Sequence, residues 1–338
     1  ATWRKFSVQL ASLIRYMHPS EIITNYLDDL TDEVVYSHAS DIDTVAYVLG
    51  IDHNYLSSQV RLHIPWFSEE EIQEADGVIV IRQILAQLRN ELSDFSINYK
   101  AHRALNGIEI LAGNAQLVKK NGEMWIADSS KKEPIIKFCN VPPSFGLEIQ
   151  KSMHYIHHAR FDTKYHFGLT MTEYVAPLCY ASFSDNDRKY LDNALLCALP
   201  DGCTKSHKIA VMTRAFGYNP LPKNMMSTLF SCSAKELKNH GYDYIVTALN
   251  PYLGFKGSIF WGASYFPFAT SPMSYIYDRY GKYLNRRNAI SGNVTEQKYT
   301  TPPILWLVHP LNRRDLNIWE KAKEYTVYNI SQEEYAKG

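Results

Sequence analysis

The chain has 338 residues, and its 35 Lys and Arg balance 35 Asp and Glu, so the formal net charge at neutral pH is zero. Apolar residues make up 46% of the sequence, which excludes a disordered tail or a fibrous repeat and allows a sizeable core. The length is sufficient for two domains. With 24 tyrosines, the chain is also rich in aromatic surface for packing or stacking.

The zero net charge hides an asymmetry along the chain. Residues 1–100 hold 7 basic and 15 acidic side chains, a balance of −8. Residues 201–314 hold 14 basic and 5 acidic side chains, a balance of +9. This predicts two units with different partners. The acidic unit would bind a protein partner, and the basic face of 201–314 would attract a polyanion such as DNA or another nucleic acid.

Cysteine usage and hydropathy predict the compartment. Five scattered cysteines without CxxC spacing favour reduced thiols over a disulfide framework. No apolar run approaches the ~20 residues of a membrane helix, and the start ATWRKFSVQL lacks the apolar core of a signal peptide. The sequence therefore predicts a soluble cytoplasmic protein without a membrane partner. The cysteines are Cys139, Cys179, Cys197, Cys203 and Cys232.

Residues 1–100 are expected to form a helical domain. Apolar residues recur at three- and four-residue spacing over 6–17 and 78–92. Ser68 followed by Glu71 has the spacing of a capping box, which predicts that a helix begins there.

Residues 41–63 contain a candidate helix-turn-helix. Ala46, Gly50 and Leu56 have the spacing of a small residue, a turn glycine and an apolar anchor. The alternative is a plain helical hairpin in which Gly50 ends a helix, and the acidic balance disfavours contacts with DNA phosphates. The residues presented to a DNA groove would be Asn54, Ser57, Ser58 and Arg61.

Residues 101–132 are predicted to contain a β-hairpin. The β-rich runs AQLVKK and EMWIAD flank Asn121-Gly122, a strong two-residue turn signal. The hairpin would be a wing on the helical domain or a connector.

Residues 133–315 alternate strands with helices, which predicts a mixed α/β domain with helices on both faces of a mixed sheet. A C-terminal helical tail is expected over 316–338. The expected elements are a strand over 133–141, a helix over 145–161, strands over 165–171 and 173–184, a polar insertion over 185–206, a strand over 207–218, a loop over 219–224, a helix over 225–241, a strand over 242–250, a short helix within 255–266, and strands near 274–278 and 304–308.

Four segments of this region carry a resemblance: HYIHHAR, the strand pair YHFGLTM and VAPLCYASF, MTRAFGYNPLPKN, and NPYLGFKGSIFWGASYF. In order and motif they resemble the GNAT acyltransferase superfamily, and within it the Mom-type DNA-modification branch of phages. The resemblance implies a GNAT-like fold and an acyl-CoA-type donor, such as acetyl-CoA, bound where the central strands splay apart. For a Mom-type enzyme it also implies transfer onto the exocyclic amine of adenine.

The loop 219–224 is the candidate donor site. It leads from a strand into a helix, and the free N–H groups at the positive end of a helix bind phosphate or pyrophosphate. The superfamily usually has a Gly-rich loop where this chain has Pro and Lys. The alternative is an ordinary strand-to-helix stop with Asn224 as the N-cap. The predicted cofactor-binding residues are Arg214, Pro222, Lys223, Asn224 and Met225.

The histidine-rich segment 154–158 is a candidate catalytic element. On a helix, His154 and His158 would share a face one turn apart, with His157 close by, which suits proton transfer or metal ligation. No third or fourth ligand is evident, so no metal is predicted. The pair His154-Tyr155 matches a His-Tyr pair of Mom-like proteins. Plain packing is the alternative.

The segment 250–260 keeps the spacing of Mom-like enzymes but changes two chemical groups. Those enzymes carry an acidic residue where Asn250 stands and a Tyr where Phe260 stands. An Asn cannot act as a general base, and a Phe cannot donate a proton. The catalytic roles have therefore moved to other side chains, among them Tyr265, or the reaction is a different one, or catalysis is lost. The predicted catalytic residues are His154, Tyr155, Asn250, Tyr252 and Ser258.

Tyrosines alternate with cations over 275–287, as a site for a single strand or a flipped base requires. The alternative is a solvated edge with buried Tyr rings. The stretch holds Tyr275, Tyr277, Arg279, Tyr280, Lys282, Tyr283, Arg286 and Arg287, and the predicted substrate-binding residues are Arg279, Tyr280, Arg286 and Arg287.

These features together predict a GNAT-like N-acyltransferase that modifies an amine, with a nucleobase in DNA as the expected acceptor. A GNAT-like transferase acting on a small-molecule or protein amine is the first alternative. A non-catalytic protein that binds nucleic acid or a partner on a GNAT scaffold is the second.

Overall fold

The computed structural model describes most of the chain. The described residues are 28–49, 53–64, 67, 72–92, 116–120, 123–127, 135–154, 158–171, 177–205, 207–217, 221–249, 257–277, 283–284 and 297–337.

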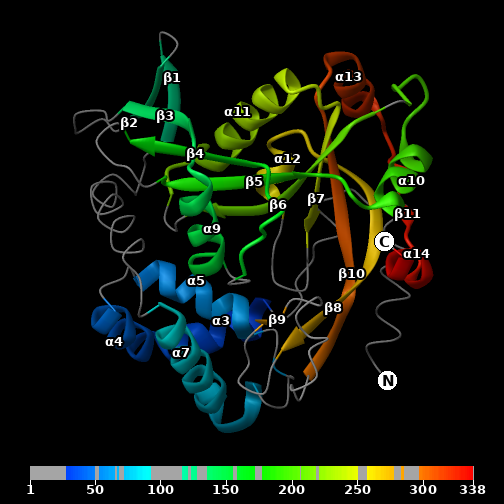
Figure 1. Cartoon of the computed structure of the whole chain (residues 1–338). Helices are drawn as coiled ribbons and strands as arrows, with labels where there is room; N and C mark the ends of the chain where they lie inside the picture. The colour runs from blue at the N-terminus through cyan, green and yellow to red at the C-terminus, as the bar shows by residue number, and fades with distance from the viewer. Residues whose placement is uncertain are drawn as a thin grey trace.

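The N-terminal helices pack on one another at one end of the molecule (Figure 1). They are α3 (Asp28–Ser37), α4 (Ala39–Leu49), α5 (His53–His63), the 3-10 turn η2 (Glu74–Gly77) and α7 (Val78–Leu92). Helix α5 contacts α3, α4 and α7. The helix predicted over 78–92 is confirmed, whereas the expected helix over 6–17 and the capping box at Ser68 and Glu71 lie outside the described residues.

The helical hairpin of α4 and α5 forms as its anchors predict. Ala46 and Leu56 are both buried between the helices, while Gly50 lies outside the described residues. Arg61, one of the residues expected to face a DNA groove, forms an ion pair with Asp32 of α3. DNA recognition by this hairpin stays a prediction.

The rest of the described chain is organised around an eleven-stranded mixed sheet. Its strand order is β1-β2-β3-β4-β5-β6-β7-β10-β8-β11, and β9 pairs with β8 off this path. The pairs β6–β7 and β8–β11 are parallel, and the other pairs are antiparallel. The strands are β1 (Gln116–Lys120), β2 (Glu123–Ala127), β3 (Ile135–Asn140), β4 (Tyr165–Met171), β5 (Cys179–Asp185), β6 (Ile209–Gly217), β7 (Tyr244–Leu249), β8 (Phe266–Tyr277), β9 (Tyr283–Leu284), β10 (Gln297–Pro310) and β11 (Tyr328–Asn329).

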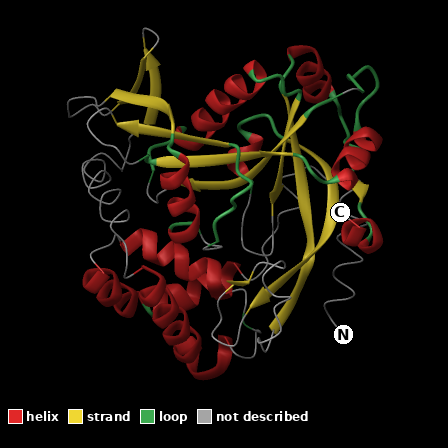
Figure 2. Cartoon of the chain, in the orientation of Figure 1, coloured by secondary structure: helices red, strands yellow, loops and turns green. Residues whose placement is uncertain are grey.

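Helices cover both faces of the sheet, so the predicted α/β class is confirmed (Figure 2). Successive residues of a strand point to opposite faces. In β6, Ala210 and Met212 join the core that includes α11, whereas Ile209 and Val211 join a second core with α10. The helices are α9 (Pro143–Ser152), α10 (Lys189–Ala198), α11 (Met225–Asn239), α12 (Ser258–Trp261), α13 (Arg313–Lys321) and α14 (Gln332–Lys337).

The polar insertion expected over 185–206 contains a helix, so that prediction is wrong. Leu191, Ala194 and Leu195 of α10 are fully buried against the sheet. Their spacing of three and four residues is helical. The Asp, Asn and Lys residues around them obscured this apolar stripe in the sequence.

The helix expected over 145–161 ends at Ser152. The N–H groups of Met153 and His154 both donate to the carbonyl of Ile149, at 2.8 and 3.1 Å, and this wide turn closes the helix. His154 and His158 therefore do not share a helix face, contrary to the prediction. His and Tyr have lower helix propensity than the residues before them, which is consistent with an end here.

The predicted hairpin forms and extends the sheet. Lys120 pairs with Glu123, which leaves Asn121-Gly122 as the two-residue connection, and β2 pairs onward with β3. The N–H of Leu117 donates to the carbonyl of Lys223 at 2.9 Å, so β1 also contacts the segment that precedes α11.

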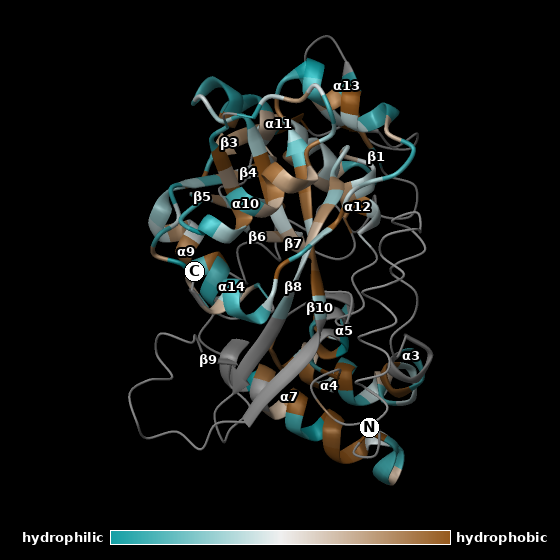
Figure 3. Cartoon of the chain, turned by 90° about the vertical axis from the view of Figure 1, so that its right-hand side faces the viewer, coloured by the Kyte–Doolittle hydropathy of each residue, from teal (hydrophilic) through white to brown (hydrophobic). Residues whose placement is uncertain are grey.

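The C-terminal residues pack against the sheet and include a strand as well as the expected helices. Strand β11 lies parallel to β8, between α13 and α14. In Figure 3 brown, apolar segments follow β10 through the middle of the molecule, whereas teal gathers on α14. The five cysteines are free, as their spacing predicts. None of the described helices is long and apolar enough to span a membrane.

Candidate functional site

The central parallel strands separate toward their carboxyl ends. The ladder between β6 and β7 pairs Ile209–Met212 with Tyr244–Thr247. Both strands continue beyond it, but Thr213–Gly217 and Ala248–Leu249 form no ladder pair with each other in the described chain. This segment of β6 pairs on its other side with β5. Ligands of open α/β sheets bind beyond the carboxyl ends of such strands.

A β-bulge lies where the two strands separate. Met212 pairs with Phe183 and Arg214 pairs with Ser182, so Thr213 is an extra residue on β6. Bulges change the direction of side chains and are frequent beside functional sites. Here the Thr213 hydroxyl turns to the same side as Ser182, and the two Oγ atoms lie 2.9 Å apart.

Four predicted cofactor-binding residues come together at the start of α11, next to the end of β6. Asn224 is the N-cap in a left-handed conformation with φ of 68°, but its side chain makes no capping hydrogen bond to the described residues of α11. Pro222 and Met225 are buried, and Lys223 is exposed. The first N–H groups of a helix have no partner within the helix, and this end of the dipole attracts anions.

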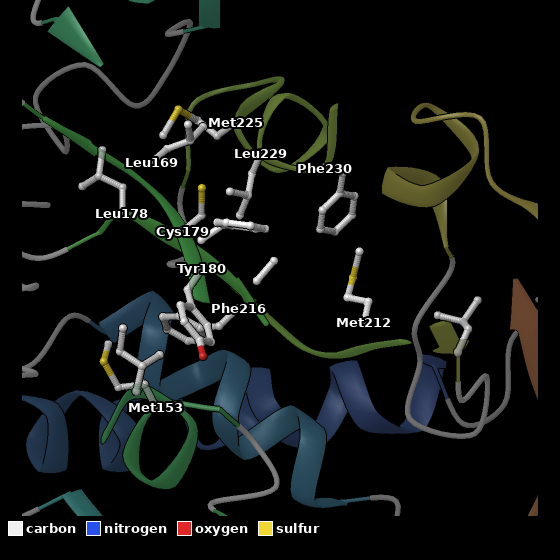
Figure 4. Close-up of a cluster of buried hydrophobic side chains, with 14 of the residues drawn as sticks. Met153, Leu169, Leu178, Cys179, Tyr180, Met212, Phe216, Met225, Leu229 and Phe230 are labelled. Carbon is white, nitrogen blue, oxygen red and sulfur yellow. The ribbon is translucent and has the colours of Figure 1, made fainter. Parts of the chain in front are cut away.

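The fifth predicted cofactor-binding residue, Arg214, lies on the other face of the sheet from α11. It is half-buried, and its Nη1 donates to the carbonyl of Thr213 at 2.7 Å. Its Nη2 lies 3.4 Å from the carbonyl of His158. Figure 4 shows Phe216, two residues further along β6, on the same side of the sheet as Met153 of the α9 segment.

A cluster of buried polar side chains lies on this α9 face. Gln150 of α9 and Ser182 are fully buried, and His166 and Tyr180 are 5% and 1% exposed. The Gln150 Oε1 accepts the N–H of Arg160 at 2.7 Å. Its Nε2 therefore donates, and it does so to the Tyr180 hydroxyl oxygen at 2.9 Å and to Thr163 Oγ1 at 3.2 Å.

Gln150 and His166 both approach the Tyr180 hydroxyl. Its oxygen accepts from Gln150 Nε2 and lies 2.6 Å from His166 Nδ1. The tautomer of the His166 ring determines which of Tyr180 and His166 donates in this second hydrogen bond. Burial raises the pKa of Tyr180 to about 12 and lowers the pKa of His166 below its ordinary value.

A glycine makes room for the His166 ring. A Cβ atom on Gly146 of α9 would lie 2.1 Å from His166 Nδ1, far inside van der Waals contact. The close approach of α9 to β4 at this point therefore requires glycine.

The remaining described candidates lie apart from this cluster or at its rim. His154 is 5% exposed after the end of α9, and Ser258 is exposed at the start of α12. Phe260, which stands where Mom-like enzymes carry Tyr, is half-buried and stacks on Phe230 with ring centroids 5.3 Å apart. Tyr265 contacts both rings, and its hydroxyl is buried.

Seven predicted site residues lie outside the described part of the chain: Tyr155, Asn250, Tyr252, Arg279, Tyr280, Arg286 and Arg287. Four tyrosines at or near the predicted substrate site do have a strand register. Tyr275 pairs with Tyr299, and Tyr277 pairs with Tyr283. Within the described residues no group of three or more His, Cys, Asp and Glu is placed to hold a metal ion.

The sequence interpretation missed the polar cluster itself. Its signal was present, because His166 interrupts a buried strand and Tyr180 and Ser182 occupy alternate positions of the next one. Polar residues on one face of a buried strand indicate a polar contact on that face. The residues missed are Gln150, His166, Tyr180, Ser182 and Thr213.

No family model matches this sequence, and no curated protein matches it. Among solved structures, the chain is similar to an N-acetyltransferase from Staphylococcus aureus Mu50, at 12% identity and a TM-score of 0.31, over 52% of this chain and 97% of that one. It is also similar to FeeM, an N-acyl amino acid synthase from uncultured soil microbes, at 13% identity and a TM-score of 0.27, over 52% of this chain and 76% of that one. Neither likeness identifies an activity for this chain, and the resemblance to Mom-type proteins stays a prediction.

Proposed function

We propose that this protein is a GNAT-type N-acyltransferase whose acyl-CoA-type donor binds between the carboxyl ends of β6 and β7. The observation that carries the proposal is the end of the parallel ladder at Met212 and Thr247, together with the bulge at Thr213. Apart from the helix α10 between β5 and β6, the succession β3, α9, β4, β5, β6, α11, β7, α12, β8 follows the element order on which the sequence resemblance rests.

The chemistry of the separated strands suits such a donor. An extended chain that carries amide groups can lie along a strand through main-chain hydrogen bonds, and the end of the β6–β7 ladder at Met212 and Thr247 is where such a chain would enter. A phosphate group at the end of the chain suits the start of α11 beside Lys223. The donor would supply an activated acyl carbonyl, and the proposal assigns the stabilisation of its oxygen to backbone N–H groups near the bulge.

Isothermal titration calorimetry with acetyl-CoA and free CoA tests donor binding. Lys223→Ala should weaken both ligands by up to about fivefold, because one exposed ion pair contributes at most about 1 kcal/mol. Lys235→Ala is the matched control, since Lys235 is an exposed lysine on α11 more than two turns beyond its start. A wild-type protein that binds neither ligand, and releases no thiol from acetyl-CoA with any amine, overturns the proposal.

We further propose a nucleobase amine in DNA as the acceptor. The balance of 14 basic against 5 acidic residues over 201–314 supports a polyanionic partner. Tyr275, Tyr277 and Tyr283 of β8 and β9 lie in the stretch 275–287, whose composition suits base stacking, and Tyr299 of β10 pairs with Tyr275.

Mass spectrometry of nucleosides tests this acceptor, after incubation of the protein with acetyl-CoA and a single-stranded or duplex oligonucleotide. An acylated nucleoside supports it. Unchanged nucleosides together with acylation of spermidine or of a lysine peptide overturn it and favour the alternative acceptors.

A non-catalytic role on the same scaffold is the other candidate, and Phe260 is the observation that favours it. The Phe260 ring packs as a core residue between Phe230 and Tyr265. The double variant Asn250→Asp, Phe260→Tyr restores the groups of Mom-like enzymes. DNA binding by both forms, with thiol release by neither, supports the binding role, whereas turnover by the wild type excludes it.

A further inference from the structure

We infer that the acceptor amine approaches the α9 face of the sheet and passes its proton along a buried hydroxyl chain, from Thr213 through Ser182 and Tyr180 to His166. This inference rests on the proposed transferase function and deepens it by assigning the proton acceptor. It also gives the two faces of the sheet different tasks, with the donor phosphates at α11 and proton removal under α9.

The hydroxyl groups form a row on one face of the sheet. Thr213 Oγ1 lies 2.9 Å from Ser182 Oγ. Ser182 lies two residues beyond Tyr180 on β5, so the two side chains lie on the same face of the strand. The Tyr180 oxygen in turn lies 2.6 Å from His166 Nδ1. Three strands thus contribute one row of polar groups through an otherwise apolar core.

Gln150 gives the chain its direction. Its amide is oriented by the Arg160 N–H, so it can only donate to the Tyr180 oxygen. The relay has the Tyr180 proton directed at His166 Nδ1, while the Tyr180 oxygen keeps capacity to accept the Ser182 proton. It also has Thr213 Oγ1 as the donor to Ser182 Oγ, so that a proton entering at Thr213 moves toward the imidazole.

The two ends of the row of hydroxyl groups differ in their access to solvent. Thr213 is half-exposed at the bulge where β6 leaves β7, whereas Ser182, Tyr180 and His166 are buried. A polar core that served stability alone would need no open end at the point where the strands separate. The open end is where an amine beside the donor carbonyl would lie.

The groups that face His166 leave it neutral at rest. Tyr180 faces it from β5, Arg214 lies beyond Tyr180 on β6, and Gly146 and Gln150 face it from α9 without charge. Burial lowers the pKa of His166, and a neutral imidazole can accept a proton. Because burial raises the pKa of Tyr180 to about 12, its phenolate does not persist and the proton continues to His166.

The amine nitrogen forms a C–N bond with the acyl carbon of the thioester, the C–S bond breaks, and the thiolate leaves with its electron pair. The amine proton goes to Thr213 Oγ1, while the Thr213, Ser182 and Tyr180 protons each move one place along the chain, and the last reaches His166 Nδ1. The imidazolium then returns a proton to solvent, and the thiolate takes one from solvent.

The pH dependence of kcat/KM for thiol release from acetyl-CoA tests the relay, with the best acceptor amine found above. The wild type should lose activity at low pH as His166 protonates. Tyr180→Phe and His166→Gln should lower kcat by about 10²- to 10⁴-fold and remove this acid limb, with donor binding in calorimetry unchanged. Ser184→Ala is the matched control, because Ser184 is a buried serine on the same face of β5 outside the chain, and it should keep the wild-type profile.

The bulge residue provides a rescue test. Thr213→Val should lose activity, and Thr213→Ser, which keeps the hydroxyl, should regain most of it. If the wild type turns over and Tyr180→Phe and Thr213→Val keep its rate and pH profile, the relay is overturned while the transferase function stands. If the wild type neither binds acetyl-CoA nor releases thiol, the transferase function fails and the relay fails with it.

A spectroscopic measurement checks the proton positions without turnover. The ¹⁵N NMR signals of the His166 ring, assigned with His166→Gln, should show a proton on Nε2 and an unprotonated Nδ1 at neutral pH. Tyr180→Phe should shift the Nδ1 signal, and Ser184→Ala should not. A proton on Nδ1 in the folded wild type contradicts the direction of the chain and overturns the relay.

Discussion

The two faces of the central sheet are both buried, but they are built differently. On the α11 face, Met225, Leu229 and Phe230 pack on apolar side chains such as Met212 and Cys179 (Figure 4). On the α9 face, a row of hydroxyl, amide and imidazole groups is buried within the same core. Buried polar groups add little stability compared with apolar packing, and they destabilise the fold when unpaired. A face that nevertheless keeps them, beside the point where two strands separate, is the better candidate for chemistry.

The largest effect is expected on the apolar face. Phe230→Ala removes a side chain that is 2% exposed and stacked on Phe260, so it should lower the free energy of unfolding by about 3–5 kcal/mol. Urea denaturation followed by circular dichroism measures this. Ser231 is the exposed neighbour of Phe230, and the free energy of unfolding of Ser231→Ala should stay within about 0.5 kcal/mol of the wild-type value. A loss below 1 kcal/mol for Phe230→Ala would mean that this face is not a close-packed core.

The next effect concerns the contact between α9 and the polar row. Gly146→Ala places a methyl group against the His166 ring and should destabilise the protein by about 1–3 kcal/mol, because the ring has no free space. It should also shift the His166 ¹⁵N signals. Gly262→Ala is the control, since its Cβ meets its nearest atom at 3.4 Å. Unchanged signals and stability in Gly146→Ala would contradict the close approach of α9.

The pH dependence of the free energy of unfolding tests the α9 face, which contains the buried imidazole of His166. Burial lowers the pKa of His166 in the folded state, so the unfolded state binds more protons once the pH falls below about 6.5, the ordinary pKa of histidine. The contribution of the neutral His166 to the free energy of unfolding is therefore complete above that pH, and it is lost as the pH falls toward the lowered pKa. His166→Gln should reduce this slope, measured by urea denaturation between pH 7 and pH 5. His309, whose pKa burial also lowers, keeps its own contribution in the variant. An unchanged slope would show that His166 is not buried in neutral form.

The smallest change in stability is expected from two serines at alternate positions of β5. Ser184 Oγ is buried and has no hydrogen-bond partner among the described residues, so Ser184→Ala should leave stability unchanged or raise it by up to about 1 kcal/mol. Ser182→Ala breaks a paired hydroxyl and should lower it by about 1–3 kcal/mol. Thermal unfolding of the two variants makes the comparison. Equal losses would indicate that Ser184 has a partner after all.

Local patterns predicted much of the fold but little of the polar row. The hairpin around Asn121-Gly122 and the helix over 78–92 are confirmed, because turn chemistry and helical periodicity are encoded in neighbouring residues. The loop at Lys223 also precedes a helix, as predicted. The His154 and His158 pair failed as a helix face, since a helix end depends on the wide turn at Ile149 that no local motif announces.

The sequence by itself determined the alternation of strands and helices, the asymmetry of charge and the place of the loop before α11, because these follow from spacing and composition along the chain. Only the tertiary structure decided that Thr213 is a bulge, that β6 and β7 separate beyond it, and that the Tyr180 hydroxyl meets both His166 and Gln150. The physical reason is that hydrogen bonds between strands and helices join residues up to tens of positions apart. Their partners are selected by packing and by the need to satisfy buried polar groups, which local sequence does not specify.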